Sequence, residues 1–130
     1  LIISTCKKHG IEAMLTSTTH KSGTDRIYEC ATILKVDDDE IIINVQADEP
    51  FIEPDVVKSL MSKLKELQNL KEDFIMGSCY NAINDEVAQD PNLVKVVLDD
   101  KHNAIYFSRS PVPYNRSGRA TYFGHIGIYG

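Results

Sequence analysis

The segment that most constrains the fold is residues 41–50 (IIINVQADEP), where an apolar run ends abruptly in polar side chains. Residues 41–45 are mostly β-branched, which is typical of a strand buried on both faces in the middle of a parallel sheet. Gln46, Asp48 and Glu49 follow, and a proline then prevents simple continuation of the strand. Because open α/β sheets bind ligands at the carboxyl ends of their strands, a carboxylate here is well placed to hold a divalent metal against a nucleotide phosphate.

Composition and charge narrow the possible classes of function. With 130 residues the chain can form one domain with a core of its own. The formal net charge of −5 argues against a surface that coats nucleic acid. No apolar run reaches the length of a membrane span, so we expect no membrane insertion. Three widely spaced cysteines without a CxxC pair are typical of thiols in a reducing cytosol, and we expect a cytoplasmic protein.

Helical and strand patterns alternate over the first half of the chain. Helical spacing is found in residues 2–9, in residues 24–34 and in the segment that Pro54 opens. Strand-like runs are residues 12–16, 41–45, 74–82, 94–98, 105–108 and 126–129. A short polar stretch joins the fourth and fifth of these runs, which predicts a hairpin. The alternation predicts an α/β fold with a three-layer arrangement, and the hairpin makes its sheet mixed.

Gln46 and Asp48 form the first candidate site. An amide close to a metal-binding carboxylate can fix a sugar hydroxyl, so the pair favours a ligand site. The alternative is that Asp48 and Glu49 only begin a solvated loop and cap the helix that Pro54 opens, since strand ends often carry polar residues. The residue types alone leave both interpretations open.

The segment HKSGTDR, residues 20–26, forms the second candidate site. Ser22 and Asp25 have the S-x-x-D spacing of a helix capping box, which taken alone is the better interpretation. The same geometry points backbone N–H groups at a ligand, and Gly23 would let that ligand approach closely. Arg26 lies one helical turn further on and could reach a base or a phosphate.

Two arginines flank a proline-rich loop in the last quarter of the chain. Arg109 and Arg116 suit a carboxylate, which a planar guanidinium grips with two hydrogen bonds. Arg109 could equally pair with one of the 19 acidic side chains. His125 lies in an apolar, glycine-flanked run that ends near Tyr129. A lone strand histidine is more often a packed, hydrogen-bonded residue than a catalyst.

Five segments together resemble one known family, although common catalytic motifs are absent. The chain has no Gly-x-Ser-x-Gly elbow, Walker A sequence or Gly-x-Gly-x-x-Gly turn, which excludes the obvious hydrolase, kinase and dehydrogenase classes. In order and over nearly the whole chain, it resembles the 3-deoxy-manno-octulosonate (Kdo) cytidylyltransferases in HKSGTDR, NVQADEP, PNLVKVVLD, YFSRSPVP and HIGIYG. The resemblance implies a nucleotide-diphospho-sugar transferase-like (Rossmann-like) fold. It also implies an enzyme that converts CTP and Kdo into CMP-Kdo and pyrophosphate for lipopolysaccharide biosynthesis.

The resemblance further implies roles for single residues. Asp48 would bind Mg²⁺ between nucleotide and sugar, and with Gln46 it would form the catalytic pair. The residues implied to surround Kdo are Gln46, Arg109, Arg116, His125 and Tyr129, with the arginines favouring its carboxylate. Those implied to lie near the cytidine are Ser22, Gly23 and Arg26. The family also suggests a homodimer.

Departures from the family pattern keep alternatives open. Ala47 stands where glycine is usual, and Gly124 stands where many members have arginine. The family's amino-terminal phosphate loop and carboxy-terminal metal-binding aspartate are missing. We therefore expect residues 1–130 to be the central part of a single cytidylyltransferase domain that is inactive by itself. The alternatives are a cytidylyltransferase for another acidic sugar of sialic-acid type, and a catalytically inactive sugar- or nucleotide-binding module.

Overall fold

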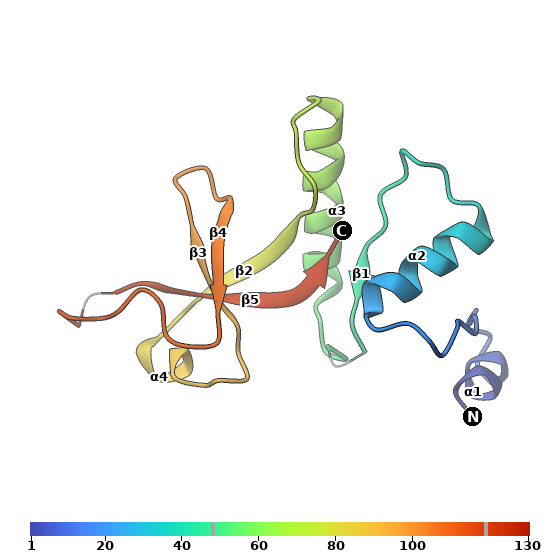
Figure 1. Ribbon diagram of the computed structural model, residues 1–130, viewed down its shortest axis with the longest axis horizontal. Coiled ribbons are helices and arrows are strands. Elements are labelled where there is room, and N and C mark those ends of the chain that lie inside the picture. Colours follow the sequence, from blue (N-terminus) through green and yellow to red (C-terminus); the bar gives the residue numbers. More distant parts are fainter. Residues whose placement is uncertain (48, 119) are drawn as a thin grey trace. The chain divides into compact units, whose positions relative to one another are not determined.

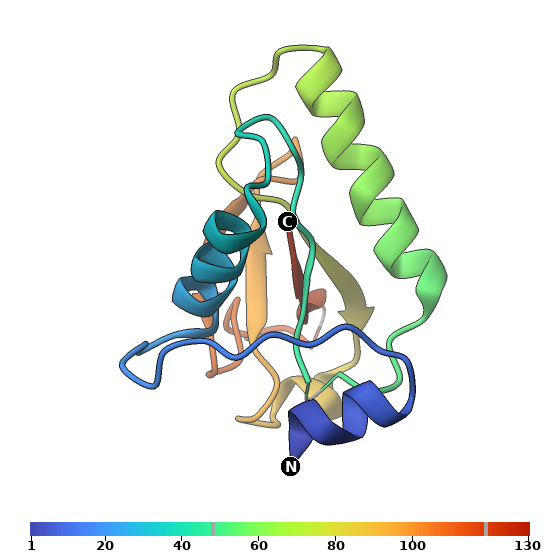
Figure 2. The same cartoon turned by 90° about the vertical axis from the view of Figure 1, so that its right-hand side faces the viewer.

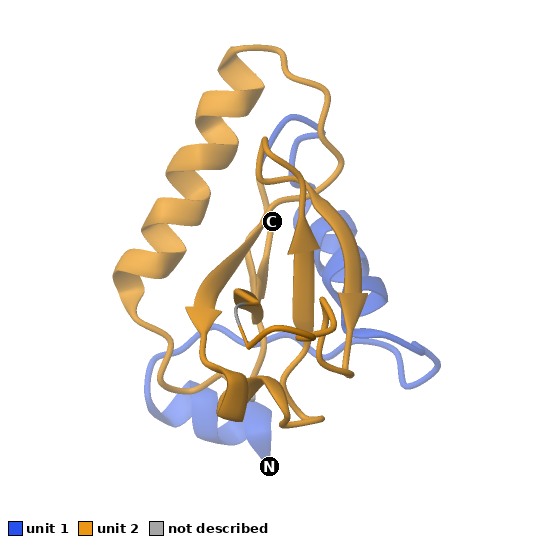
Figure 3. Cartoon of the chain, turned by 90° about the vertical axis from the view of Figure 1, so that its left-hand side faces the viewer, with its two compact units in different colours: residues 1–40 blue, residues 41–130 orange. Residues whose placement is uncertain are grey.

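The computed structural model describes residues 1–47, 49–118 and 120–130, which form two compact units, residues 1–40 and 41–130 (Figure 3). Figure 1 shows the helices α1 (Ile2–Lys8), α2 (Gly23–Leu34), α3 (Pro54–Asn69) and α4 (Asp85–Ala88). The strands are β1 (Asn44–Val45), β2 (Ser78–Ile83), β3 (Lys95–Leu98), β4 (Ala104–Ser108) and β5 (Tyr122–Tyr129). Across the described ranges, no helix combines the length and the apolar character needed to cross a membrane.

The first unit contains α1 and α2, both of which the sequence predicts. Ser22 is the N-cap of α2: its side chain accepts a hydrogen bond from the N–H of Asp25, whose carboxylate accepts one from the N–H of Ser22. The helix ends at Lys35, which adopts a left-handed conformation with φ of 53°. The prediction of a strand at residues 12–16 is wrong, because those residues form no strand. An apolar run becomes a strand only when a neighbour shares its backbone hydrogen bonds.

The second unit is organised around β5. This strand pairs antiparallel with β2 over the length of β2, including Tyr80 opposite His125. Near its carboxyl end β5 also pairs with β1, where Asn44 lies opposite Tyr129. On β3, Lys95 lies opposite Gly124 of β5, and β3 pairs antiparallel with β4 as the predicted hairpin requires.

The prediction of a central parallel strand buried on both faces at residues 41–45 is wrong. Only Asn44 and Val45 form a strand, and their neighbour β5 runs antiparallel. Ile41 and Ile43 pack against the core, whereas Ile42 is 38% exposed. The β-branched run therefore buries only one of its faces. The apolar composition of a strand indicates that it is buried, but it does not indicate whether one or both faces are covered. The α/β class itself is confirmed. The prediction of a mixed sheet is wrong, because every strand pair among the described residues is antiparallel.

Helix α3 packs on one face of the sheet, alongside β2 and β5 (Figure 2). Pro54 occupies its first turn, and Leu60 and Leu64 bury against Ile128 of β5, which is fully buried. Ile126 packs against the same cluster. Because side chains alternate along a strand, positions 125, 127 and 129 lie on the opposite face of β5. That opposite face carries His125 and Tyr129, two of the five predicted sugar-site residues.

Candidate functional site

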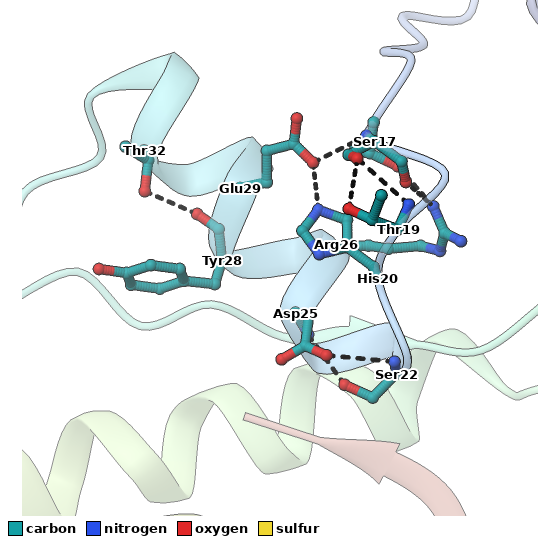
Figure 4. A network of polar contacts seen from close by, with 10 residues as sticks. Ser17, Thr19, His20, Ser22, Asp25, Arg26, Tyr28, Glu29 and Thr32 are labelled. Atoms are coloured by element: carbon teal, nitrogen blue, oxygen red, sulfur yellow. Dashed lines mark hydrogen bonds and ion pairs between the residues drawn. The ribbon is translucent and has the colours of Figure 1, made fainter.

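In the first unit, a polar network holds the loop that precedes α2 (Figure 4). Glu29, on α2, accepts a hydrogen bond from the N–H of Ser17 at 2.9 Å and contacts the Nε2 atom of His20. The His20 hydrogen bond, followed by the Ser17 N–H, lowers the pKa of the Glu29 carboxyl. The loop is therefore anchored to α2 by the Glu29 carboxylate, and these hydrogen bonds favour the ionised form of that group.

Arg26 reinforces the same loop. Its Nη1 atom donates to the Thr16 hydroxyl at 2.9 Å and to the Ser17 carbonyl oxygen at 2.8 Å (Figure 4). The sequence predicts that Arg26 reaches a base or a phosphate; in the structure one end of its guanidinium is engaged by the loop. The group has five N–H donors, so a ligand could still bind the others.

Ser22 and Gly23 begin α2, and the predicted capping box is confirmed. The hydrogen bond from Ser22 is the largest cause that lowers the pKa of Asp25. A Cβ atom built at Gly23 would meet no heavy atom within 4 Å, and its φ lies outside the left-handed region. Neither packing nor backbone conformation among the described residues therefore requires glycine at this position. The open space beside Gly23 would admit a closely approaching ligand.

In the second unit, His125 is half-buried and hydrogen-bonded, as expected for a strand histidine. Its Nε2 atom lies 2.7 Å from the Ser78 hydroxyl oxygen, and Phe107 packs edge-on against the ring at a centroid distance of 5.2 Å. Burial lowers the pKa of His125 below its usual value, and the negative charge of Glu49 partly opposes that shift. Ser78 was not predicted from the sequence, because nothing local connects it to a residue 47 positions away.

The turn after β1 is fastened to β5 by Glu49. Its Oε1 atom accepts a hydrogen bond from the N–H of Gly127 at 3.3 Å, and its own N–H donates to the Gln46 carbonyl oxygen. A Cβ at Gly127 would lie 2.8 Å from that Oε1 atom, so a larger residue there would have to displace the Glu49 carboxylate. Asp48, the predicted metal ligand, lies outside the described residues. Of the predicted catalytic pair, the structure describes Gln46, whose side chain is exposed.

Arg109 follows directly after β4, and hydrogen bonds hold both its guanidinium group and its main-chain carbonyl. Its Nη1 atom donates to the carbonyl oxygens of Pro91 at 2.9 Å and Asn92 at 3.3 Å. Its own carbonyl oxygen accepts a hydrogen bond from Lys95, which is fully buried. Backbone carbonyls, not a carboxylate, are thus the partners of Arg109 among the described residues. The sequence analysis did not identify Lys95 as a buried residue. Its one indication in the sequence is that it is a single charged residue within the apolar run NLVKVVL.

The remaining predicted residues differ in their surroundings. Arg116 is exposed, and among the described residues no ion pair involves its side chain. Tyr129 is half-buried at the end of β5, opposite Asn44 of β1. The structure thus places Gln46 directly after β1, which pairs with the strand β5 that carries His125 and Tyr129, and Phe107 of β4 contacts the His125 ring. Within the described ranges, which exclude Asp48, no cluster of three side chains that could bind a metal exists.

Comparisons with known proteins match this chain over its full length. The sequence profile of the cytidylyltransferase family matches residues 1–130. The 3-deoxy-manno-octulosonate cytidylyltransferase of Wolinella succinogenes is 50% identical over 132 residues, covering 98% of this chain and 54% of that protein. The protein of the same name from Nitratiruptor is 51% identical, covering 99% and 54%. The chain therefore spans about half the length of the curated relatives it matches.

A solved structure agrees with these relatives. It is described as CMP:2-keto-3-deoxy-manno-octonic acid synthetase complexed with CTP. It superposes with a TM-score of 0.83 at 36% sequence identity, covering 98% of this chain and 51% of that chain. The predicted nucleotide-diphospho-sugar transferase-like fold is therefore confirmed.

Proposed function

Because the chain belongs to the cytidylyltransferase family, we propose that its protein activates Kdo with CTP, giving CMP-Kdo and pyrophosphate for lipopolysaccharide biosynthesis. The observation that carries the proposal is the superposition of 98% of this chain on a CMP-Kdo synthetase complexed with CTP. Relatives at 50% and 51% identity bear the Kdo cytidylyltransferase name, which favours Kdo over another acidic sugar and favours catalysis over simple binding.

The sugar would bind on the face of β5 that carries His125 and Tyr129, near the turn that begins at Gln46. Arg109 and Arg116 would hold the carboxylate of Kdo. Arg109 suits this role because the carbonyls of the loop before β3 hold its Nη1 atom, which orients the rest of the guanidinium. A guanidinium already oriented in this way loses less conformational entropy on gripping a carboxylate.

The cytidine would bind near Ser22, Gly23 and Arg26. Two observations support this assignment: a ligand can approach the open space beside Gly23, and the anchored loop holds Arg26 in one orientation. The first turn of α2 adds a positive helix-dipole end, which favours a negatively charged ligand. These features make the capping box compatible with both a structural and a binding role.

The magnesium ion of the proposed reaction would be held by Asp48, and the donor chemistry fits. Mg²⁺ prefers hard oxygen ligands, which the carboxylate of Asp48 supplies, while the amide of Gln46 would hold a hydroxyl of the sugar. When bound, the ion would neutralise phosphate charge that grows during the reaction. Glu49 would contribute by holding the turn that carries Gln46 against β5.

The chemistry asks for positioning and does not need a covalent enzyme intermediate. The anomeric hydroxyl of Kdo would attack the α-phosphorus of CTP in line, and pyrophosphate would leave. Side chains of this chain would hold the carboxylate and hydroxyls of Kdo so that the attacking oxygen stays near the phosphorus. Such positioning converts a bimolecular step into an effectively unimolecular one. We further propose a cytoplasmic homodimer, as the family resemblance suggests.

The direct test is an assay of pyrophosphate release by the complete protein with CTP, Kdo and Mg²⁺. The proposal expects release that depends on all three components. Replacing Kdo by a sialic acid should remove most of the release. Calorimetric binding of CTP without any release in the presence of Kdo and Mg²⁺ would identify a binding module and overturn the enzymatic proposal.

A further inference from the structure

The hydroxyl group of Ser78 lies between a carbonyl and the His125 ring. Its oxygen is 2.6 Å from the Ile128 carbonyl oxygen and 2.7 Å from Nε2 of His125. The Ile126 carbonyl oxygen is more distant, at 3.5 Å. A carbonyl oxygen accepts but never donates, and 2.6 Å is an ordinary O–H···O distance. The single hydroxyl hydrogen of Ser78 therefore points to Ile128.

That assignment determines the hydrogen on the His125 ring. Once the Ser78 hydrogen is used on Ile128, the Ser78 oxygen faces Nε2 with a lone pair. Two lone pairs at 2.7 Å would repel, so Nε2 must carry a hydrogen and donate it. In the neutral ring the other nitrogen, Nδ1, is then an acceptor.

An irregularity in the sheet brings Ser78 to this point. Between Ser78 and Cys79 the register shifts: Ser78 lies opposite Tyr129, whereas Cys79 lies opposite Ile126. The intervening part of β5 therefore arches past Ser78, which gives its hydroxyl access to the strand carbonyls. Bulges of this kind re-aim side chains next to functional sites. Phe107, packed edge-on at 79° to the ring, limits the orientation of His125.

We propose that Ser78 is a positioning residue that fixes His125 in the Nε2–H tautomer, so that Nδ1 accepts a hydrogen bond from a hydroxyl group of the sugar substrate. This inference rests on the proposed function, in which His125 contacts Kdo. An acceptor nitrogen selects a hydroxyl and repels a carboxylate, so His125 recognises the polyol part of the substrate while the arginines take its acid group. Burial favours the neutral ring that this role requires.

The tautomer can be measured without any substrate. We would label the histidines of the complete protein with ¹⁵N and record long-range ¹H–¹⁵N NMR spectra near neutral pH, assigning the ring of interest with His125→Gln. The expected result is a protonated Nε2 and an unprotonated Nδ1. Ser78→Thr should keep this pattern because it keeps the hydroxyl, whereas Ser78→Ala should give a mixture of tautomers. A protonated Nδ1 in the unaltered protein would overturn the proposal.

Steady-state kinetics provide a second test of the proposal. Losing a hydrogen bond of ordinary strength predicts that Ser78→Ala raises KM for Kdo about three- to tenfold, with KM for CTP unchanged. Ser78→Thr should restore KM for Kdo, and Ser59→Ala, exposed on α3, is the matched control. An equal rise in both KM values would indicate a purely structural role and overturn the proposal. Absence of all turnover with Kdo, with the NMR pattern intact, would instead contradict the proposed function.

Discussion

Lys95 donates a hydrogen bond from its buried ammonium group to the main-chain oxygen of Arg109 at 2.5 Å. The same nitrogen donates to the carbonyl oxygens of Asp90 at 2.9 Å and Leu93 at 2.8 Å. An ammonium has three donors, and three carbonyls use them all. No carboxylate of the described residues pairs with this charge, which is tolerated because every donor is satisfied. The clamp ties the loop before β3 to the residue that follows β4.

Removing this clamp should destabilise the protein. Lys95→Met preserves much of the side-chain volume but leaves three carbonyl oxygens without their donor, which predicts a loss of roughly 3 kcal/mol in the free energy of unfolding. Denaturant titration of the complete protein measures it. Lys101→Met, at an exposed position in the β3–β4 turn, is the control and should change stability little. A loss from Lys95→Met no larger than that of the control would contradict the clamp.

Arg116→Ala should affect sugar binding without affecting the fold. Arg116 is exposed and makes no ion pair with a described residue, so we expect the free energy of unfolding to change by less than about 0.5 kcal/mol. Loss of a charge-assisted contact to the carboxylate predicts a rise of about tenfold or more in KM for Kdo, and little change in KM for CTP. Steady-state kinetics with each substrate varied in turn would refute the assignment if both KM values rose equally.

Ser22→Asp separates helix capping from nucleotide binding. Aspartate caps helices as well as serine does, so stability should stay within about 0.5 kcal/mol. A new negative charge beside the proposed nucleotide site should raise KM for CTP about fivefold or more through repulsion of the phosphates. Asn84→Asp makes a similar exchange at the N-cap of α4, where Asn84 accepts from the N–H of Val87, and serves as the control. Equal KM values for CTP in the two variants would remove Ser22 from the nucleotide site.

His125 should make stability and sugar affinity sensitive to acid. Its pKa in the fold lies below the ordinary value of 6.5, chiefly through burial and despite Glu49. The unfolded chain therefore takes up the proton first, so the contribution of neutral His125 is complete above pH 6.5 and is lost as the pH falls toward the lowered pKa. Denaturant titrations across this range should show a smaller loss in His125→Gln, which carries no titrating ring.

That comparison needs the matched variant because other groups act in the same direction. The pKa values of Asp25, Glu29 and Asp99 are also lowered, mainly by hydrogen bonds, so their stabilising effects decline in acid as well. Those carboxyls titrate below the range of histidine. Identical pH dependence in the unaltered protein and in His125→Gln would show that the ring titrates alike in the folded and unfolded chains.

Local patterns predicted α1, α2, α3 and the hairpin well, whereas the short helix α4 was not predicted. The Ser22–Asp25 capping box, the first-turn proline of α3 and the polar stretch between β3 and β4 each involve residues a few positions apart. Strand boundaries were predicted less well. The run predicted as residues 74–82 begins as a strand only at Ser78, and the strand predicted at residues 126–129 begins already at Tyr122. Strand ends depend on where a partner stops, which a single run of residues does not reveal.

The sequence by itself determined the α/β class, the starts of α1, α2 and α3, the hairpin and, through five short segments, the family. Only the tertiary structure decided the neighbours of the site residues. Ser78 meets Ile128 across 50 positions, and Glu49 meets Gly127 across 78. The physical reason is that helix caps and turns are stabilised within one stretch of backbone, whereas these hydrogen bonds form only after strands from distant parts of the chain have paired.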